Sequence, residues 1–289
     1  MSDRFSKLID LMAALRAPNG CPWDRKQTHE SLKPYLLEEA YEVLEIIDHQ
    51  DHIKLREELG DVLLQVIFHS QIAAEAGTFT IDEVVEQLST KLIRRHPHVF
   101  GNDNTAAKPA NGEQVLSQWE EIKKAERQAA GGPQSALDGV PKALPALLRA
   151  YQVQARASRV GFDWSHDAVG LEEVFKKITE EIGELRDALA QSQTNPATST
   201  DDIAGELGDL LFSLVNLARF IKVNPEDALR QSTNRFVERF ALVESQAADQ
   251  HRALTDMTLA EMDALWEAAK QRLREQIPPH TSPSTQENI

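Results

Sequence analysis

The strongest constraint on this chain is a pattern of paired acidic residues on predicted helices. In the second half, residues 177–209 contain KITEEIGEL and, after a polar interruption, GELGDLLF. If both pieces are helical, Glu181 and Glu184 lie three residues apart on one face, and Glu206 and Asp209 do the same on the next helix. Four carboxylates in a partly buried groove need a counter-charge. Oxygen ligands without a thiol or an imidazole indicate Mg²⁺, with Mn²⁺ also possible.

The same pattern occurs earlier in the chain. Residues 37–68 contain LEEAYEVLEI, a short polar break and REELGDVLLQVIF, which supply four acids at matching positions: Glu39, Glu42, Glu58 and Asp61. The offset is 142 residues from Glu39 to Glu181 and 148 residues from Asp61 to Asp209, because the second break is longer. One acidic pair alone is common on solvated helix faces. Two copies in the same order, each followed by an apolar run, indicate a duplicated unit.

The sequence of the second acidic helix in each copy leads to two further predictions. An apolar stripe that includes Leu59, Leu63, Val66 and Ile67 is expected to face a core. A glycine also separates the two acids, at Gly60 in the first copy and at residue 208 in the second, at a cost of about 1 kcal/mol in helix propensity relative to alanine. This cost predicts close approach of another group, through helix packing, site geometry or both.

Bulk properties restrict the class of protein. A length of 289 residues suggests about two domains. The chain has 31 basic and 46 acidic residues and a net charge of −15, which disfavours duplex nucleic acid or an anionic membrane as a partner. Its single cysteine, Cys21, excludes an internal disulfide and a cysteine-rich zinc site. The start of the sequence does not resemble a signal peptide, and no run approaches 18 apolar residues, so we expect a soluble, cytoplasmic protein.

The periodicity of the whole chain predicts an all-α fold of two tandem helical bundles, because neither half has a convincing strand pattern. We expect an amino-terminal domain over residues 1–128, a linker rich in Gly, Pro and Ala over 129–145, and a carboxyl-terminal domain over 146–277. Residues 278–289 are predicted to form a disordered tail. Thr80 and Glu83 form a capping-box pattern that predicts a helix beginning at Ile81 and ending near RRHPHVFG. His96 and His98, in that last segment, fit a helix terminus better than a metal site.

These motifs together resemble a known family. The doubled E-E-x-x-E and E-L-G-D, with GCPWD, RRHPHVF and two W-E-x-x-K segments, resemble the MazG family of the all-α nucleoside triphosphate pyrophosphatase superfamily, over nearly the whole chain up to the tail. The resemblance implies Mg²⁺-dependent hydrolysis of nucleoside triphosphates to monophosphate and pyrophosphate by a homodimer or larger assembly. It also implies that the carboxyl-terminal copy carries the main activity. The family often has basic and acidic residues just before the second acidic pair, whereas residues 201–205 of this chain are DDIAG.

The resemblance also assigns roles to individual residues of the second copy. Glu181, Glu184, Glu206 and Asp209 would hold the metal, and Lys177, one turn before Glu181, would meet phosphate oxygens. The nucleotide would contact a further set of residues that includes Trp266, expected to stack on the base: Phe236, Arg239, Phe240, Trp266 and Lys270. Glu39, Glu42, Glu58 and Asp61 would form the equivalent metal site of the first copy, whose activity stays open.

The chemistry fits these residue types. Phosphoryl substitution needs charge neutralised on the phosphate oxygens and a water placed in line with the leaving group. We therefore expect water to attack the α-phosphorus, with Glu180 or Glu181 as candidate general base and a broad range of bases accepted, as nucleotide-pool housecleaning would require. A di-iron carboxylate bundle would need Glu-x-x-His, which is absent at these glutamates. A non-catalytic helical nucleotide-binding or scaffold protein with solvated acids stays open as the alternative.

Overall fold

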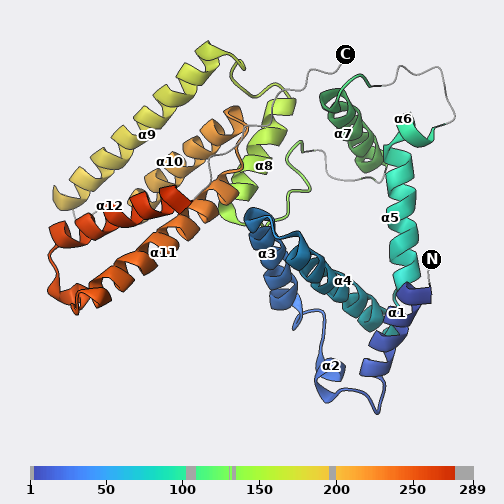
Figure 1. The fold of residues 1–289 in the computed structure, drawn as a ribbon. Helices are drawn as coiled ribbons and strands as arrows, with labels where there is room; N and C mark the ends of the chain where they lie inside the picture. Colours follow the sequence, from blue (N-terminus) through green and yellow to red (C-terminus); the bar gives the residue numbers. More distant parts are fainter. Residues whose placement is uncertain (1–2, 102–108, 130, 132–134, 195–199, 277–289) are drawn as a thin grey trace, which may run out of the picture. The chain divides into compact units, whose positions relative to one another are not determined.

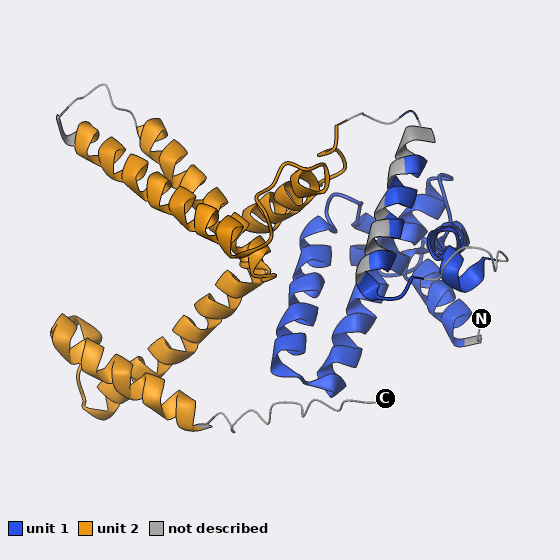
Figure 2. Ribbon diagram, turned by 90° about the horizontal axis from the view of Figure 1, so that it is seen from above, with its two compact units in different colours: residues 1–132 blue, residues 133–289 orange. Residues whose placement is uncertain are grey.

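The computed structural model describes residues 3–101, 109–129, 131, 135–194 and 200–276, and every regular element in these ranges is a helix (Figure 1). The prediction of an all-α fold is therefore confirmed. The chain divides into two compact units, Met1–Gly132 (unit 1) and Pro133–Ile289 (unit 2), shown in blue and orange in Figure 2. The finer division into domains and linker stays a prediction, and the expected tail, 278–289, lies outside the described residues. None of the described helices combines the length and the apolar character that crossing a membrane requires.

Unit 1 is built around a helical hairpin. Its helices are α1 (Asp3–Arg16), α2 (Pro22–Lys26), α3 (Lys33–His49), α4 (His52–Glu75), α5 (Ile81–Arg95), α6 (Pro97–Phe100) and α7 (Gly112–Ala129). Helix α3 packs along α4, α1 and α5 also contact α4, and α7 contacts α5. The capping box predicted at Thr80 and Glu83 is present and starts α5. Asp51 caps α4 by accepting hydrogen bonds from the backbone N–H groups of Ile53 and Lys54.

The core of unit 1 covers only part of the predicted apolar stripe of α4. Met12, Leu32, Ile67 and Phe68 form a buried cluster, which is extended by Phe5, Leu8 and Ile72. Of the stripe, Ile67 is buried, but Leu59 is 52% exposed, and Leu63 and Val66 are also exposed. The prediction that the whole stripe faces a core is therefore wrong for a single chain. The reason is that the core cluster includes side chains of α1 but covers only one side of α4.

Unit 2 consists of two helical hairpins and a helix that contacts both. The elements are α8 (Ala146–Arg159), α9 (Ala168–Thr194), α10 (Thr200–Phe220), α11 (Pro225–Asp249), the short 3₁₀ helix η1 (Leu254–Asp256) and α12 (Leu259–Gln276). Helix α9 packs along α10, α11 packs along α12, and α8 contacts α10 and α11. The acidic pairs of the second copy therefore lie on the α9–α10 hairpin, and Trp266 lies on the α11–α12 hairpin.

A buried ion pair fixes the loop before α9 to the last turns of α10. Arg219 of α10 is buried and donates hydrogen bonds to Asp163, of which the Nη1 bond is 2.8 Å long, and to the side-chain oxygen of Asn216. The Nε2 atom of His166 donates a hydrogen bond to the carboxylate of Asp163 at 2.9 Å, and the His166 ring stacks on Phe220 with 4.6 Å between ring centroids. The loop that contains VGFDW thus holds the carboxyl-terminal end of the helix that supplies Glu206 and Asp209.

Candidate metal and nucleotide site

Three acids of the second copy converge. One carboxylate oxygen from each of Glu181, Glu206 and Asp209 lies within 4.8 Å of the other two. Glu181 comes from α9, whereas Glu206 and Asp209 come from α10, where their three-residue spacing places them on one face. Glu181 is only 4% exposed, so its carboxylate has lost most of its contact with water. The packing of α9 against α10 therefore gathers three negative groups from two helices.

Lys177 supplies the positive charge beside this acidic group. Its Nζ donates to Glu180 at 2.7 Å and to Glu181 at 2.8 Å. These hydrogen bonds, first with Glu180 and then with Glu181, raise the pKa of Lys177, so that the ammonium stays charged. Glu180 and Lys177 are more exposed than Glu181. The two general-base candidates of the second copy, Glu180 and Glu181, are thus tied to one lysine.

The fourth predicted acid, Glu184, lies outside the group of three but within its electrostatic reach. Burial raises the pKa of Glu184 first, and the charges of Glu181 and Glu206 raise it further, while Lys177 opposes them. The structure therefore brings three of the four predicted acids together and leaves the fourth beside them.

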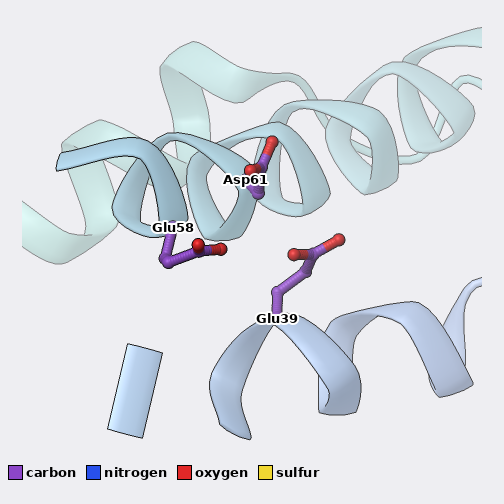
Figure 3. A group of neighbouring side chains, drawn as sticks. All are labelled: Glu39, Glu58 and Asp61. Carbon is purple, nitrogen blue, oxygen red and sulfur yellow. The ribbon is translucent and has the colours of Figure 1, made fainter. Parts of the chain in front are cut away.

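The first copy repeats this arrangement (Figure 3). One oxygen from each of Glu39, Glu58 and Asp61 lies within 4.8 Å of the other two, and all three are half-buried. Glu39 projects from α3 toward Glu58 and Asp61, which project from α4. Glu42 is again the acid that lies outside the group. Two independent hairpins of the same chain therefore form the same carboxylate triad.

The counter-charge differs between the copies. Tyr35 occupies the position four residues before Glu39 that Lys177 occupies before Glu181, and Lys54, one turn before Glu58, is the nearby base of the first copy. Desolvation raises the pKa of Glu58, the charges of Glu42 and Asp61 raise it further, and Lys54 lowers it. In the first copy the nearby positive charge therefore lies on the second helix of the hairpin, α4, whereas in the second copy Lys177 lies on the first helix, α9.

A polar residue that the sequence patterns missed also belongs to the first triad. Burial raises the pKa of Glu39, as do the charges of Asp61 and Glu42, and a side-chain hydrogen bond from Gln65 lowers it. Gln65 is buried, and its Oε1 has no hydrogen-bonding partner among the described residues. The signal was present in the sequence, because Gln65 follows Asp61 by one helical turn and so shares its face.

The two glycines between the acids do not meet close neighbours within one chain. A Cβ atom added to Gly60 or to Gly208 would find no heavy atom within 4 Å, apart from the neighbouring backbone of its own helix. The prediction that these glycines allow another group to approach is therefore wrong for the single chain. Both positions lie on an open part of the helix surface.

The predicted nucleotide-binding residues gather on the other hairpin of unit 2. Phe236 and Phe240 of α11 stack with ring centroids 5.9 Å apart, and Phe236 packs on Trp266 of α12 at 5.1 Å. Arg239 lies over the Trp266 ring at 5.8 Å, a cation–π distance, and its buried Nε has no hydrogen-bonding partner among the described residues. Lys270 donates to Glu267 at 2.7 Å. The structure therefore brings Phe236, Phe240, Trp266 and Arg239 together as an aromatic and cationic platform, and Lys270 lies one helical turn after Trp266 on α12.

The donor set of both triads fits a divalent cation. All three ligand atoms of each triad are carboxylate oxygens, which suit hard cations, and their mutual separations are short enough for one ion to bridge them. Desolvation, and after it the charge of neighbouring carboxylates, raises the pKa of Glu39, Glu58 and Glu184, so a cation beside these groups would favour their ionised form. The acidic clusters of both copies can therefore bind a metal ion.

Comparison with known proteins agrees with the duplication. The family model described as the MazG nucleotide pyrophosphohydrolase domain matches twice, over residues 27–100 and 170–242, and these ranges contain both triads. A nucleoside triphosphate pyrophosphohydrolase/pyrophosphatase MazG of Thermotoga maritima is 46% identical over 92% of this chain and 95% of its own length. A nucleoside triphosphate pyrophosphohydrolase of Escherichia coli K12 is 40% identical over 93% of this chain and 98% of its own length. The chain therefore belongs to the MazG nucleotide pyrophosphohydrolase family.

Proposed function

We propose that this protein is a nucleoside triphosphate diphosphatase that hydrolyses NTPs and dNTPs to the monophosphate and pyrophosphate with Mg²⁺, and that unit 2 carries the main activity. The observation that supports this proposal most strongly is the convergence of Glu181, Glu206 and Asp209 beside Lys177. The names of the Thermotoga and Escherichia relatives, which match over nearly their full lengths, support the same reaction. Cleavage of the anhydride between the α- and β-phosphates yields these two products, and we place the attack of water at the α-phosphorus.

The residues of unit 2 would have different roles in the reaction. Glu181, Glu206 and Asp209 would hold Mg²⁺ with Glu184 beside them, and Mn²⁺ offers similar coordination. The bound metal would supply positive charge to the phosphate oxygens and lower the pKa of a coordinated water. Lys177 is placed to transfer its hydrogen bonds from Glu180 and Glu181 to phosphate when a nucleotide arrives. That transfer would free Glu180 or Glu181 to accept a proton from the attacking water.

The platform of α11 and α12 would hold the base. Trp266 with Phe236 and Phe240 offers aromatic surface to any base, because every base has a π face, and this tolerance favours a broad substrate range. Arg239 and Lys270 would share the charge of the phosphate chain. A wide range of accepted bases would suit removal of noncanonical nucleotides from the pool.

A homodimer is the assembly that the exposed surfaces of unit 2 support. Leu207, Leu211 and Phe212 of α10 are exposed, as is Val237 of α11, although they belong to the helices that carry the proposed site. Large apolar side chains grouped on the same helices indicate an interaction surface. A second copy that covers these helices would also fill the space beside Gly208. Size-exclusion chromatography with light scattering measures the mass directly, and a monomer would contradict this part of the proposal.

The proposals about cellular location and about partners that are disfavoured rest mainly on the sequence. A cytoplasmic location agrees with the absence of a membrane-crossing helix among the described residues and with the single cysteine. The net charge of −15 disfavours duplex nucleic acid as a partner.

The test of the reaction is a panel of NTPs and dNTPs with Mg²⁺, in which the products are resolved by ion-exchange chromatography. We expect monophosphate and pyrophosphate with every base, and we expect Asp209→Ala to abolish their release. Asp61→Ala is the matched substitution in the first copy and should leave most of the turnover intact. Diphosphate and orthophosphate as products would contradict attack at the α-phosphorus. Full activity of Asp209→Ala would exclude the triad of unit 2 as the catalytic centre.

A further inference from the structure

Unit 1 contains two histidines in contact that the proposed reaction does not use, and we call them the histidine pair. His29 lies in the segment between α2 and α3, and His69 lies on α4. Both side chains are half-buried, and although 40 residues separate them in the sequence, their Nδ1 atoms are 2.8 Å apart. The pair therefore joins the segment that precedes α3 to the side of α4.

The two imidazoles meet edge to edge. Their planes are inclined by only 5°, and their ring centroids are 5.1 Å apart, much farther than the two Nδ1 atoms. Parallel rings whose nitrogens face each other at that distance form an N–H···N hydrogen bond, in which one Nδ1 carries the hydrogen and the other accepts it. The facing nitrogens can therefore hold one proton between them but not two.

A second proton would break this hydrogen bond. If both imidazoles were charged, both Nδ1 atoms would carry hydrogen, and two donors of like charge would face each other without an acceptor between them. The Nε2 atom of His69 is buried and has no hydrogen-bonding partner among the described residues, so a charged His69 would also leave a buried N–H without an acceptor. The closed pair can therefore carry one positive charge at most.

Few other charges act on the pair. Burial lowers the pKa of His69 first, and the charge of His29 lowers it further. Arg16 of α1 lies over the ring of the adjacent Phe68 at 5.5 Å, but Glu75 accepts from this guanidinium at 2.8 Å. Among the described residues no further charge contributes to the pKa of His69, including the ionisable groups that α1, the segment around His29 and the first turn of α5 bring toward α4: Lys7, Asp10, Glu30, Lys33, Asp82 and Glu83.

The segment that carries His29 also supplies a core residue. Leu32, three positions after His29, is 1% exposed and belongs to the core cluster together with Phe68, the neighbour of His69 on α4. Helix α3 begins directly after Leu32, and its Glu39 is the acid that α3 contributes to the first triad. The histidine pair therefore holds the start of α3 against α4, at the open end of the hairpin that brings these acids together.

The second copy has leucines at the aligned positions. The offsets that relate the acids of the two copies are 142 residues on the first helix and 148 on the second, and they align His29 with Leu171 and His69 with Leu217. The repeated hairpin can thus form with apolar side chains at these positions. Histidine is the side chain whose ordinary pKa, about 6.5, lies closest to neutral pH. Two histidines here therefore give the hairpin of unit 1 a sensitivity to pH that leucines cannot provide.

We propose that the histidine pair is a pH-sensitive switch, which holds the start of α3 on α4 near neutral pH and opens when both imidazoles are protonated. The open pair binds two protons and the closed pair binds one at most, so acidification favours the open state. Below the ordinary histidine pKa of about 6.5, opening should become about tenfold more favourable for each pH unit. Opening frees the amino-terminal end of the helix that carries Glu39.

Hydrogen exchange of the full-length protein tests the switch at its own position. Mass spectrometry follows peptides over residues 27–36, which include backbone hydrogen bonds at the start of α3. After correction for the intrinsic exchange rate, the protection of this segment in wild type should fall by about tenfold between about pH 6 and pH 5. His29→Asn can still hydrogen-bond to Nδ1 of His69 but carries no charge, so its protection should change little over this range. His49→Asn, at an exposed position in the last turn of α3, is the matched control and should behave as wild type does.

A second measurement follows the imidazoles directly and needs no variant to fold. In long-range ¹H–¹⁵N NMR spectra of wild type, two of the nine histidines should titrate in two linked steps, with the second step below the ordinary pKa of about 6.5. Their signals should be those lost in His29→Asn or His69→Asn, and circular dichroism shows whether each variant is folded. The proposal is overturned if all nine histidines titrate in single independent steps, if the protection of wild type is unchanged between about pH 6 and pH 5, or if folded His29→Asn loses protection as wild type does. Neither readout depends on hydrolysis, so failure of the proposed reaction would be recognised separately.

Discussion

Replacement of Glu206 by glutamine should change stability in opposite directions with and without metal. In the metal-free protein an oxygen of Glu206 lies within 4.8 Å of oxygens of Glu181 and Asp209. Two like charges at that distance repel by about 0.9 kcal/mol in water and by about 3.5 kcal/mol at an effective dielectric constant of 20. Glu206 is half-buried and Lys177 offsets part of the charge on Glu181, so we expect Glu206→Gln to stabilise the metal-free protein by about 1 kcal/mol.

With metal the order should reverse. At a hundredfold excess over its Kd, Mg²⁺ would stabilise wild type by about 2.7 kcal/mol, whereas a variant with a weakened site would gain little. In a protein of this size 1 kcal/mol corresponds to about 2–4 °C in Tm. Scanning calorimetry of both proteins, in EDTA and in MgCl₂, should therefore show Glu206→Gln melting above wild type in EDTA and below it in MgCl₂.

Two controls define the result. Glu244→Gln removes an exposed carboxylate of α11 outside the site and should alter neither the Tm in EDTA nor the rise with MgCl₂. Glu58→Gln, the matched substitution in the first copy, reports whether the triad of unit 1 binds metal in the same way. If Glu206→Gln shows the same metal-induced rise as wild type, or melts lower than wild type in EDTA, the three acids do not act as one metal site. Solvated acids that act independently would produce that outcome.

Three further substitutions test other parts of the structure. Asp163→Asn breaks a buried pair with Arg219 and should cost about 3–5 kcal/mol in urea unfolding. Burial alone would raise the pKa of Asp163, but hydrogen bonds from Arg219 and His166 hold this pKa below the usual 3.8. The stability that the ion pair contributes is therefore complete above pH 3.8 and is lost on acidification. Calorimetry of wild type should show the Tm falling as the pH is lowered below 4. Gly208→Ala should stabilise a monomeric chain by about 1 kcal/mol, because alanine favours the helix and no neighbouring atom blocks its Cβ. If a second chain packs closely against Gly208, the variant should instead dissociate to the monomer mass on light scattering. Trp266→Ala should raise KM for all bases by roughly tenfold through lost stacking, as measured in steady-state kinetics.

The helices and the grouping of the acids could be predicted because both depend on local rules. Residues three apart on a helix project in one direction, so the spacing of Glu206 and Asp209 predicts their common face without knowledge of the fold. The capping box at Thr80 likewise sets the start of α5 from four residues of sequence. The repeat then predicts that the hairpins of both halves bring their acids together, and three acids of each half do so.

The features that could not be predicted depend on what lies across from each helix. The spacing that places Glu181 and Glu184 on one face gives no information about the angle at which α10 crosses α9, and Glu184 lies outside the group of three. The apolar stripe of α4 has the right period, but period alone does not say whether the same chain covers it, and Leu59 and Val66 are exposed. For the same reason helix propensity marks Gly60 as unusual without showing what approaches it.

The two copies differ in a way that bears on their chemistry. In unit 2 the lysine is on α9, the helix of the buried acid, and Lys177 is hydrogen-bonded directly to Glu181. In unit 1 Tyr35 takes that position and Lys54 is on α4, while a neutral amide, Gln65, hydrogen-bonds the corresponding acid, Glu39. In the proposed mechanism Lys177 would transfer its hydrogen bond from Glu181 to a phosphate oxygen, whereas the neutral amide of Gln65 would bring no charge to the phosphate. If the proposed mechanism holds, this difference favours unit 2 as the main site of the reaction, although both halves present the same three carboxylates.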